Sequence, residues 1–419
     1  MTPRDSPRAE EPREVRKPGA PISPIAATPA NRHRLRIASP SRARVRLPDA
    51  MNLDPSAFPT ELQSIAAKVF SGVRLDEADA LICLTTPNVL HLGQLAHHVR
   101  TKLHGNVTYF NINRHINPTN VCVYTYNCKF CSFAAMKDEP HAWAMTHEQI
   151  YQKAAEQGGN KVTEFHIVGG LHPDIGLDWY LEMLRGLKER FPQAHLKAFT
   201  AIEIGWFAKR EKISIEETLR LMRDAGLGSL PGGGAEIFHP EVRAIICDGK
   251  LDADEWIEVH RVAHRMGIKS NCTMLFGHVE KSAHKVDHLL RLRSLQDEFG
   301  GFNAFIPLAY HPENNYLGLE YHTTGLDDLR HIATARLVLD NIPHVKAYWV
   351  MVTPKLAQVA LSFGADDLDG TVVRETIYHM AGAETAQMMP TTELERVVRA
   401  AGFTPVERDT LYNAVDRAN

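Results

Sequence analysis

Hydrophobic and polar residues follow different patterns before and after Gly105. Before it, apolar residues recur at three- and four-residue spacing over 59–84 and 87–105, which is typical of amphipathic helices. Thr60 and Asp76 stand where N-caps are expected. The segment 51–105 is therefore predicted to be a group of N-terminal helices.

After Gly105 the chain alternates between short β-rich runs and longer amphipathic segments. The predicted strands are 106–113, 162–170, 195–204, 227–237, 268–278, 302–312 and 344–352. The predicted helices are 146–157, 178–190, 215–225, 253–266 and 283–298. Such alternation indicates βαβ units, and this number of them predicts an α/β fold with a parallel βα barrel of the TIM type, closed or partial. The barrel core is expected over 106–390, followed by a C-terminal helix (391–402) and a polar tail within 391–419.

The first 50 residues differ in composition from the rest of the chain. They hold 9 of the 24 prolines and are rich in Arg. We expect a disordered, basic, Pro-rich tail over 1–50, because such a segment buries too little apolar surface to fold. A nucleic-acid arm, a targeting peptide, or translation starting at Met51 are the alternatives.

Overall composition excludes several classes of function. The net charge of −3 predicts neither nucleic-acid binding nor attachment to an anionic membrane. No run approaches the roughly 18 apolar residues of a membrane span. Six cysteines in 419 residues are no disulfide framework, and three of them fall within ten positions. This clustering predicts a metal site in a soluble, cytoplasmic protein.

Polar and small residues gather where predicted strands end, in VGGLHP, TAIEI, PGGGAE, FGHVE and YHPENN. Each motif alone is compatible with ordinary turn chemistry. Because active sites of βα barrels lie at the carboxyl ends of the strands, five such motifs together predict a functional site there.

Cys122, Cys128 and Cys131 form a C-x5-C-x2-C motif after the first barrel strand. Three thiolates in one loop suit an iron–sulfur cluster and leave one iron open for substrate. A structural zinc site, with His115 or His141 as fourth ligand, is the alternative. The remaining cysteines, Cys83, Cys247 and Cys272, stand in apolar contexts and are predicted to be core residues.

Around this motif, the sequence resembles the radical S-adenosylmethionine (SAM) enzymes and, more narrowly, the aminofutalosine synthases of menaquinone biosynthesis. The resemblance extends over about 51–387. It is carried by NRHINPTNVC, GGLHPD, LKAFTAIEI, SLPGGGAEIF, FIPLAYHPEN, NIPHVKAYWVM, ALSFGADDLDGTVV and IYHMAGAET. One departure is the cysteine spacing, which is two residues longer between the first pair than the familiar C-x3-C-x2-C.

The resemblance implies a radical-SAM barrel in which the three cysteines ligate a [4Fe–4S] cluster and SAM chelates the open iron. It further implies that Gly169 and Gly170 approach the methionyl group and that Glu236 accepts from the ribose hydroxyls. Glycines 232–234 would leave room for the adenosine. Phe130 and Phe133 would shield the cluster or contact the adenine.

The implied reaction adds the 5′-deoxyadenosyl radical to 3-[(1-carboxyvinyl)oxy]benzoate with loss of carbon dioxide as bicarbonate, which gives 6-amino-6-deoxyfutalosine and methionine. A reductant such as flavodoxin or ferredoxin would be the partner. The alternatives are a sister radical SAM enzyme (dehypoxanthine futalosine cyclase or deazaflavin-cofactor synthase) and, in another class, a non-redox zinc-stabilised barrel.

A substrate with two carboxylates requires cationic or hydrogen-bonding partners. The candidates at predicted strand ends are Arg114, His115, His172, Lys197, His278, His311 and Lys346. Lys346, Tyr348 and Trp349 could line the pocket for the aryl ring. The acidic residues Asp366, Asp367 and Asp369 are expected to cap a loop and not to bind calcium.

Overall fold

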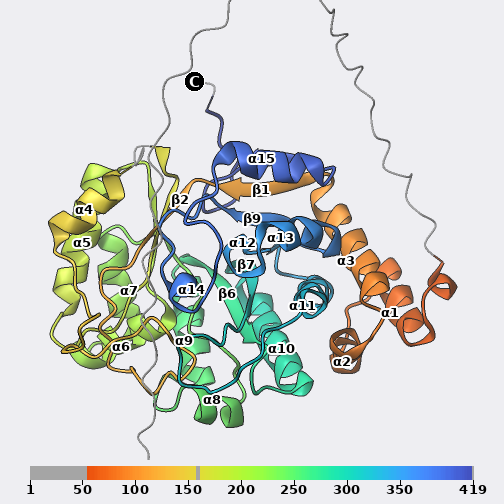
Figure 1. Cartoon of the computed structure of the whole chain (residues 1–419), viewed down its shortest axis with the longest axis horizontal. Coiled ribbons are helices and arrows are strands. Elements are labelled where there is room, and N and C mark those ends of the chain that lie inside the picture. Colours follow the sequence, from red (N-terminus) through yellow and green to blue (C-terminus); the bar gives the residue numbers. More distant parts are fainter. Residues whose placement is uncertain (1–53, 157–160, 418–419) are drawn as a thin grey trace, which may run out of the picture. The chain divides into compact units, whose positions relative to one another are not determined.

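A curved sheet of seven parallel strands forms the centre of the protein, with helices on its outer face (Figure 1). The computed structural model describes residues 54–156 and 161–417. The disorder expected for residues 1–50 falls outside this range. Strand order follows the sequence, from β2 through β8 without a crossover. The predicted α/β fold with a parallel, partial barrel is confirmed.

The barrel strands are β2 (Asn113–Ile116), β3 (Glu164–Ile167), β4 (His195–Ala198), β5 (Ser229–Leu230), β6 (Lys269–Phe276), β7 (Phe302–Ala309) and β8 (His344–Val345). The helices that follow them are α4 (His147–Ala155), α5 (Leu177–Arg190), α6 (Ala201–Glu211), α7 (Ile215–Asp224), α8 (Pro240–Ile246), α9 (Ala253–Arg265), α10 (Ser282–Phe299) and α11 (Gly325–Val338). The later helices are α12 (Trp349–Val352), α13 (Pro354–Ala360), α14 (Ile377–Met380) and α15 (Thr391–Ala400).

The segment 106–113, predicted as one strand, belongs to two sheets. Its first part is β1 (Val107–Asn111), which pairs with β9 (Asp367–Gly370) and β10 (Thr404–Glu407) in a separate parallel sheet. The barrel begins only at β2, which pairs with β3. The segment after the last helix, predicted as a polar tail, contains β10. The last helix itself, α15, ends two residues before the predicted end.

Residues 366–373 occupy the gap between the first and last barrel strands. On one side, Ala347 after β8 donates its backbone N–H to the carbonyl of Asp367 at 2.8 Å. On the other side, His115 of β2 donates to the carbonyl of Val373 at 2.9 Å. A segment far along the chain thus joins the two edges of the barrel sheet.

Two predicted strands are shorter than expected because helices begin within them. In 195–204 the strand ends at Ala198, since Thr200 caps α6 and exchanges hydrogen bonds with Glu203 in a capping box. In 344–352 the strand ends at Val345, and the aromatic run continues into α12. Both errors arise from β-branched and aromatic residues, which favour strands only when the local caps do not oppose them.

The N-terminal helices are α1 (Thr60–Ser71), α2 (Glu77–Thr85) and α3 (Val89–His104), after a short 3-10 turn (Pro55–Ala57). Asp76 caps α2 as predicted, accepting a hydrogen bond from the Asp79 backbone at 3.0 Å. Thr60 is instead the first residue of α1, whose N-cap is Pro59. Helix α3 packs on α11, and α2 packs on α10, so these helices cover the late side of the barrel.

None of the helices within residues 54–156 and 161–417 combines the length and the apolar composition that crossing a bilayer requires. This finding agrees with the sequence, which contains no sufficiently long apolar run.

Candidate active site

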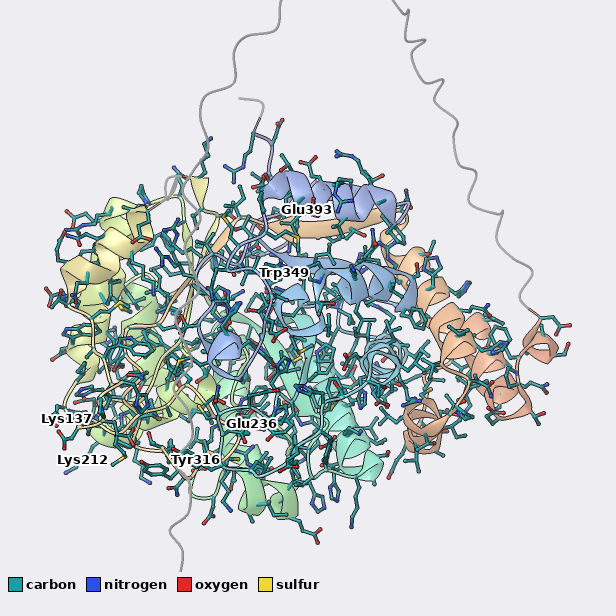
Figure 2. All side chains as sticks on the ribbon, viewed as in Figure 1. Lys137, Lys212, Glu236, Tyr316, Trp349 and Glu393 are labelled. Carbon is teal, nitrogen blue, oxygen red and sulfur yellow. The ribbon has the colours of Figure 1, made fainter. Side chains whose placement is uncertain are left out.

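A cavity of about 290 Å³ lies at the carboxyl ends of the barrel strands and extends down between them. Its walls include the three clustered cysteines and the glycines after β3. Strands β2, β3, β6 and β7 contribute side chains, and Tyr348 contributes from the segment after β8. Figure 2 shows Glu236 among the interior side chains, away from the exposed Lys137 and Lys212. The predicted site residues Cys122, Cys128, Cys131, Gly169, Gly170, Glu236 and Phe130 all line this cavity.

The cysteine segment has no regular secondary structure, yet its backbone is fixed by hydrogen bonds to its surroundings. Cys122 donates its backbone N–H to the carbonyl of Ala135 at 3.0 Å. The next residue, Val123, donates to Leu171 at 3.1 Å, and Lys129 donates to Ile246 at 2.8 Å. Each contact holds the segment to a different element, so the thiols are oriented before any ligand binds.

The longer spacing between Cys122 and Cys128 forms a tight turn. Thr125 donates its backbone N–H to the carbonyl of Cys122, and Cys128 donates to Tyr124, at 3.1 and 3.0 Å. Tyr126, at the tip, adopts a left-handed φ of 69°. The two additional residues are therefore accommodated in a turn without displacing either cysteine from the cavity wall.

The cysteine side chains fit a cluster better than a single ion. Four ligands of one zinc ion stand about 3.8 Å apart, as the Zn–S distance of roughly 2.3 Å requires. Within the part of the chain that the structure describes, three groups of possible ligand atoms lie within 4.8 Å of one another, and the cysteines belong to none of them. His141, one suggested fourth ligand, is exposed and lies outside the cavity.

The environment of the thiols also suits a cluster. Burial raises the pKa of the Cys131 thiol, while backbone N–H groups of Phe133 and Ala134 donate to its sulfur. Such N–H···S bonds are one of the means by which proteins stabilise cluster thiolates. Cys83, Cys247 and Cys272 are buried outside the cavity, as predicted for core residues.

Gly169 and Gly170 are constrained first of all by the cysteine segment. A Cβ on Gly170 would stand 2.2 Å from the carbonyl oxygen of Val121, and one on Gly169 would stand 3.0 Å from that of Thr119. Gly170 also donates its N–H to Thr119 at 2.8 Å. The absence of side chains here allows the cysteine segment to lie against the end of β3.

Glu236 forms an ion pair with Lys250 inside the cavity. The Lys250 Nζ lies 2.6 Å from Glu236 Oε1 and 5.4 Å from the ring centroid of Phe130. The other carboxylate oxygen of Glu236 takes no hydrogen bond from the residues that the structure describes. Glu236 also adopts a left-handed φ of 49°, in a turn whose Gly232 lies directly against the backbone of Asn271.

Glu203 is a buried carboxyl group in the cavity wall. It accepts hydrogen bonds from the backbone of Thr200 at 2.6 Å and of Gly169 at 3.2 Å. Burial nevertheless raises its pKa to about 7, because the loss of hydration outweighs these hydrogen bonds. The group therefore carries a proton for part of the time near neutral pH.

The segment after β9 covers the cavity from the C-terminal side. Glu375, Ile377 and Tyr378 all line it. Glu375 is buried and accepts hydrogen bonds from the backbone of Tyr378 and from His379 Nδ1, at 3.0 and 2.9 Å. Since Ile377 and Tyr378 belong to α14, this helix forms part of the cavity wall.

Of the seven candidates for binding substrate carboxylates, only His115 lines the cavity. The structure gives four of the others specific protein partners. Arg114 donates to backbone carbonyls at the end of α4, Lys197 pairs with Glu164, His278 with Glu280, and Lys346 with Asp369. His172 and His311 lie outside the cavity wall. Trp349 also lies outside it and donates to the Gly370 carbonyl at 2.8 Å.

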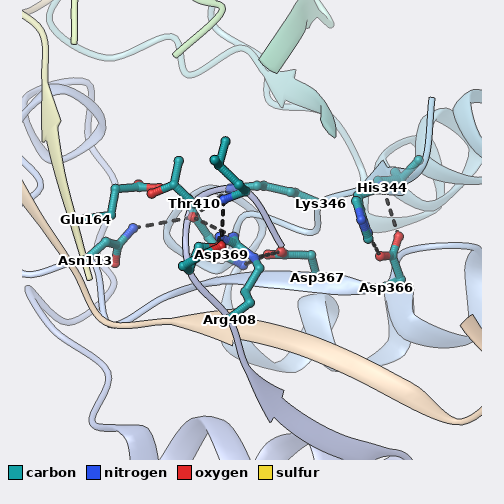
Figure 3. A network of polar contacts seen from close by, with 12 residues as sticks. Asn113, Glu164, His344, Lys346, Asp366, Asp367, Asp369, Arg408 and Thr410 are labelled. Atoms are coloured by element: carbon teal, nitrogen blue, oxygen red, sulfur yellow. Dashed lines mark hydrogen bonds and ion pairs between the residues drawn. The ribbon is translucent and has the colours of Figure 1, made fainter. Parts of the chain in front are cut away.

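The acidic run 366–369 does more than cap a loop: Asp367 accepts a hydrogen bond from the Asp369 backbone N–H, and all three carboxylates also form buried ion pairs. Asp366 pairs with Arg336, Asp367 with Arg408, and Asp369 with Lys346, at 2.5, 2.5 and 2.9 Å. All of these side chains are buried (Figure 3). These partners could not be recognised in the sequence, because they lie on other elements and are brought together only by the closure of the barrel.

The cavity residues that were not predicted from the sequence include His166, Glu203, Lys250, Glu375 and Tyr378. A signal existed for His166, since His115 and His166 occupy matching positions near the ends of two predicted neighbouring strands. No signal existed for Lys250 or Glu375, which reach the cavity from loops.

Comparison with known proteins agrees with this geometry. The sequence profile of the Radical SAM superfamily matches residues 116–292, and that of the CofH/MqnC C-terminal region matches residues 299–419. The first profile contains the cysteine segment, and the second contains β9, α14 and β10.

Several characterised relatives cover most of the chain. The aminodeoxyfutalosine synthase of Thermus thermophilus is 44% identical over 366 residues, which are 86% of this chain and 96% of that protein. The enzyme of the same name from Streptomyces coelicolor is 44% identical over 84% and 93%. The 5-amino-6-(D-ribitylamino)uracil–L-tyrosine 4-hydroxyphenyl transferase of Methanopyrus kandleri is 41% identical over 76% and 88%.

Among solved structures, methylornithine synthase (PylB) has a TM-score of 0.65 at 17% identity, covering 81% of this chain and 97% of its own. The hydrogenase maturase HydG from Carboxydothermus hydrogenoformans has a TM-score of 0.65 at 16% identity, with coverage of 84% and 80%. At such identities the likeness concerns the fold alone. Together with the sequence relatives, it establishes that the chain is a radical SAM enzyme and belongs to the family that combines the radical SAM barrel with the CofH/MqnC C-terminal region.

Proposed function

We propose that this enzyme is an aminodeoxyfutalosine synthase. It would join the adenosyl group of SAM to the vinyl carbon of 3-[(1-carboxyvinyl)oxy]benzoate, release carbon dioxide as bicarbonate, and form 6-amino-6-deoxyfutalosine for menaquinone biosynthesis. The observation that carries the proposal is the 44% identity over 96% of the Thermus thermophilus aminodeoxyfutalosine synthase.

In this proposal Cys122, Cys128 and Cys131 hold a [4Fe–4S] cluster at the mouth of the cavity. When bound, the cluster supplies the electron that splits SAM into methionine and the adenosyl radical. The three thiols line one cavity and leave its remaining space for SAM and the second substrate, which supports this assignment.

Gly169, Gly170, Glu236 and Phe130 would bind SAM. The free oxygen of Glu236 is suited to accept from the ribose hydroxyls, while the ion pair with Lys250 orients the carboxylate. The backbone after β3 approaches the cavity closely enough for a methionyl group to lie against it. Phe130 would cover the adenine or the cluster.

The apolar part of the cavity would receive the aryl ring. Val168, Ile306, Leu308 and Tyr348 contribute to its wall. The cover formed by α14 would exclude water and stray hydrogen donors from the radical. We place the enzyme in the reducing cytoplasm, with flavodoxin or ferredoxin as electron donor, because the proposed ligands are free thiols.

A second candidate is the sister activity, transfer of a hydroxyphenyl group from tyrosine. It is favoured by the 41% identity to the Methanopyrus kandleri transferase. The two activities differ in their products, because addition to a vinyl carbon retains the adenosyl group in the product. The alternative of a zinc-stabilised, non-redox barrel is not supported by the separation of the thiols.

The test is anaerobic cluster reconstitution, followed by reduction in the presence of SAM and the enol-ether benzoate, with mass spectrometry of the products. We expect an adenosyl–benzoate adduct that has lost carbon dioxide. Free 5′-deoxyadenosine without adduct, or turnover of tyrosine with 5-amino-6-(D-ribitylamino)uracil, would contradict the proposal.

Two variants test the cysteine assignment. Cys128→Ala should abolish the cluster absorbance and all SAM cleavage. Cys272→Ala removes a buried thiol outside the cavity and should retain both. Equal loss in the two variants would mean that the cysteines act through the fold and not through the cluster.

A further inference from the structure

Two histidines face the cavity from neighbouring strands, below the cysteine segment. His115 in β2 and His166 in β3 are register partners, and their rings stack with centroids 4.5 Å apart. His166 precedes Gly169 by three residues, which corresponds to about 10 Å along an extended strand. The pair therefore lies deeper in the barrel than the residues proposed to bind SAM.

Both rings have buried nitrogens without a hydrogen-bond partner. Within the described residues, His115 Nε2 and His166 Nδ1 neither donate nor accept a hydrogen bond. His115 is only 6% exposed. Burial lowers the pKa of both imidazoles and keeps them neutral, so each ring has one N–H to donate. Leaving such polar atoms unpaired destabilises a fold by about 1–3 kcal/mol per group, which is difficult to explain without a ligand.

The charged groups around the histidines are already paired with one another. Lys197, the register partner of His166 in β4, lies 2.5 Å from Glu164. Lys346 lies 2.9 Å from Asp369, which also lines the cavity. These lysines are therefore committed to protein carboxylates and are poorly placed to bind those of a substrate.

Two further carboxylates of the cavity wall, those of Glu236 and Glu375, are also paired with cationic or hydrogen-bonding side chains of the protein. Glu236 pairs with Lys250 at 2.6 Å, and Glu375 with His379 at 2.9 Å. Among the described residues of the deep wall, the histidine pair has two ring nitrogens without a hydrogen-bond partner, His115 Nε2 and His166 Nδ1. An anion that entered here would meet N–H donors, and of the carboxyl groups that line the described cavity only Glu203 has no cationic partner.

We propose that His115 and His166 bind the ring carboxylate of the aryl substrate. This inference rests on the proposed function and extends it to a named contact. The vinyl carbon must lie near the adenosyl group at the mouth of the cavity, so the opposite end of the substrate, which carries the ring carboxylate, points toward the deep wall. Val168 and Tyr348 then flank the ring between the two ends.

The experiment compares two substrates in the reconstituted enzyme. One is 3-[(1-carboxyvinyl)oxy]benzoate, and the other is the same enol ether on an unsubstituted phenyl ring. His166→Phe and His115→Phe should raise KM for the benzoate about 10- to 100-fold, as expected for loss of a hydrogen bond to a charged group. KM for the phenyl compound should not change.

A binding and a stability measurement accompany the kinetics. Benzoate alone, titrated into the holoenzyme by calorimetry, should bind to the wild type and not to either variant. Because the variants remove unpaired buried nitrogens, thermal unfolding of the ligand-free protein should not fall and is expected to rise. His260→Phe is the matched control, since His260 is buried outside the cavity and bonded to Ser270 at 2.9 Å. It should keep the wild-type preference for the benzoate.

Two outcomes would overturn the inference, and they are distinguishable. If the wild type forms the adduct but the histidine variants change KM equally for both substrates, or for neither, the histidines do not bind the ring carboxylate. If the wild type forms no adduct from the benzoate, the proposed function fails, and the assignment of this carboxylate fails with it.

Discussion

Gly170 lies so close to the cysteine segment that no side chain fits there. A Cβ would stand 2.2 Å from the carbonyl oxygen of Val121, which is backbone and cannot rotate away. We expect Gly170→Ala to displace the segment that carries Cys122, at a cost of about 1–3 kcal/mol. Iron content after reconstitution should fall by a larger fraction than the free energy of unfolding does.

Gly325→Ala is the control for that substitution. Gly325 is the first residue of α11, and a Cβ there would meet only ordinary contacts at 3.5 Å. It should leave iron content unchanged and raise stability slightly, by up to about 1 kcal/mol. Iron binding by Gly170→Ala at the wild-type level would show that the segment can move without harm.

Because the pKa of Glu203 is raised, we expect the stability of the protein to depend on pH. Its pKa is raised from 4.5 to about 7, so between these values the folded protein binds more protons than the unfolded chain. Stability contributed by the protonated group is complete below pH 4.5 and is lost as the pH rises through 7, by about 3 kcal/mol in total. Glu203→Gln should lack this component.

Urea unfolding of wild type and Glu203→Gln at pH 5 and pH 8, without SAM, measures the difference. Because Gln stays neutral, we expect the variant to be close to the wild type in stability at pH 5 and more stable than the wild type at pH 8. Parallel pH profiles for the two proteins would mean that Glu203 is ionised in the folded state over the whole range.

Site residues could be predicted from the sequence where their spacing along the chain is enough to indicate what they bind. Cys122, Cys128 and Cys131 are recognisable from their spacing, and all three line the cavity. Lys250 was not predictable, because only the fold brings it to Glu236, fourteen positions earlier in the chain. Lys197 and Lys346 looked available for a substrate because their buried partners are distant in the sequence.

At the level of elements, alternation of strands and helices predicted the barrel, while local caps decided where elements end. The β-branched run at 200–204 reads as strand, but the capping box of Thr200 and Glu203 begins a helix there. The pairing of β10 with β1 could not be predicted, because about 290 residues separate them and neither strand is buried by its neighbours in sequence.

The buried ion pair of Arg408, just after β10, is expected to contribute to the stability of the protein. Its Nε lies 2.5 Å from Asp367 Oδ2, and both side chains are almost fully buried. Arg408→Met would leave the Asp367 carboxylate buried without its cation, which typically costs about 3–5 kcal/mol. Chemical denaturation should show a loss of this size.

A double variant separates loss of charge from loss of packing. Arg408→Met with Asp367→Asn removes both charges and keeps an amide oxygen for the Asp369 backbone N–H. It should recover most of the stability. Arg396→Met, which breaks an exposed pair on α15, should cost less than about 1 kcal/mol. A loss for Arg408→Met as small as that of Arg396→Met would mean that the buried pair contributes little.

On the scale of the whole molecule, the core is built from residue 58 onward. We therefore expect a chain that starts at Met51 to fold, bind iron and cleave SAM as the full-length protein does. Thermal unfolding and iron analysis of the two proteins check this expectation. A lower unfolding temperature for the shorter chain would assign residues 1–50 a structural role.

The junction of the barrel edges by residues 366–373 has a consequence for synthesis of the protein. A ribosome adds about 5–20 residues per second, so Cys131 is translated on the order of half a minute before Val373. During this interval the cysteine segment has been made, but the strand that completes the wall beside it has not. These thiols are therefore fully protected from oxygen and from other metal ions only near the end of translation. Any metal that binds to the cysteines before the chain leaves the ribosome would bind to an incomplete barrel.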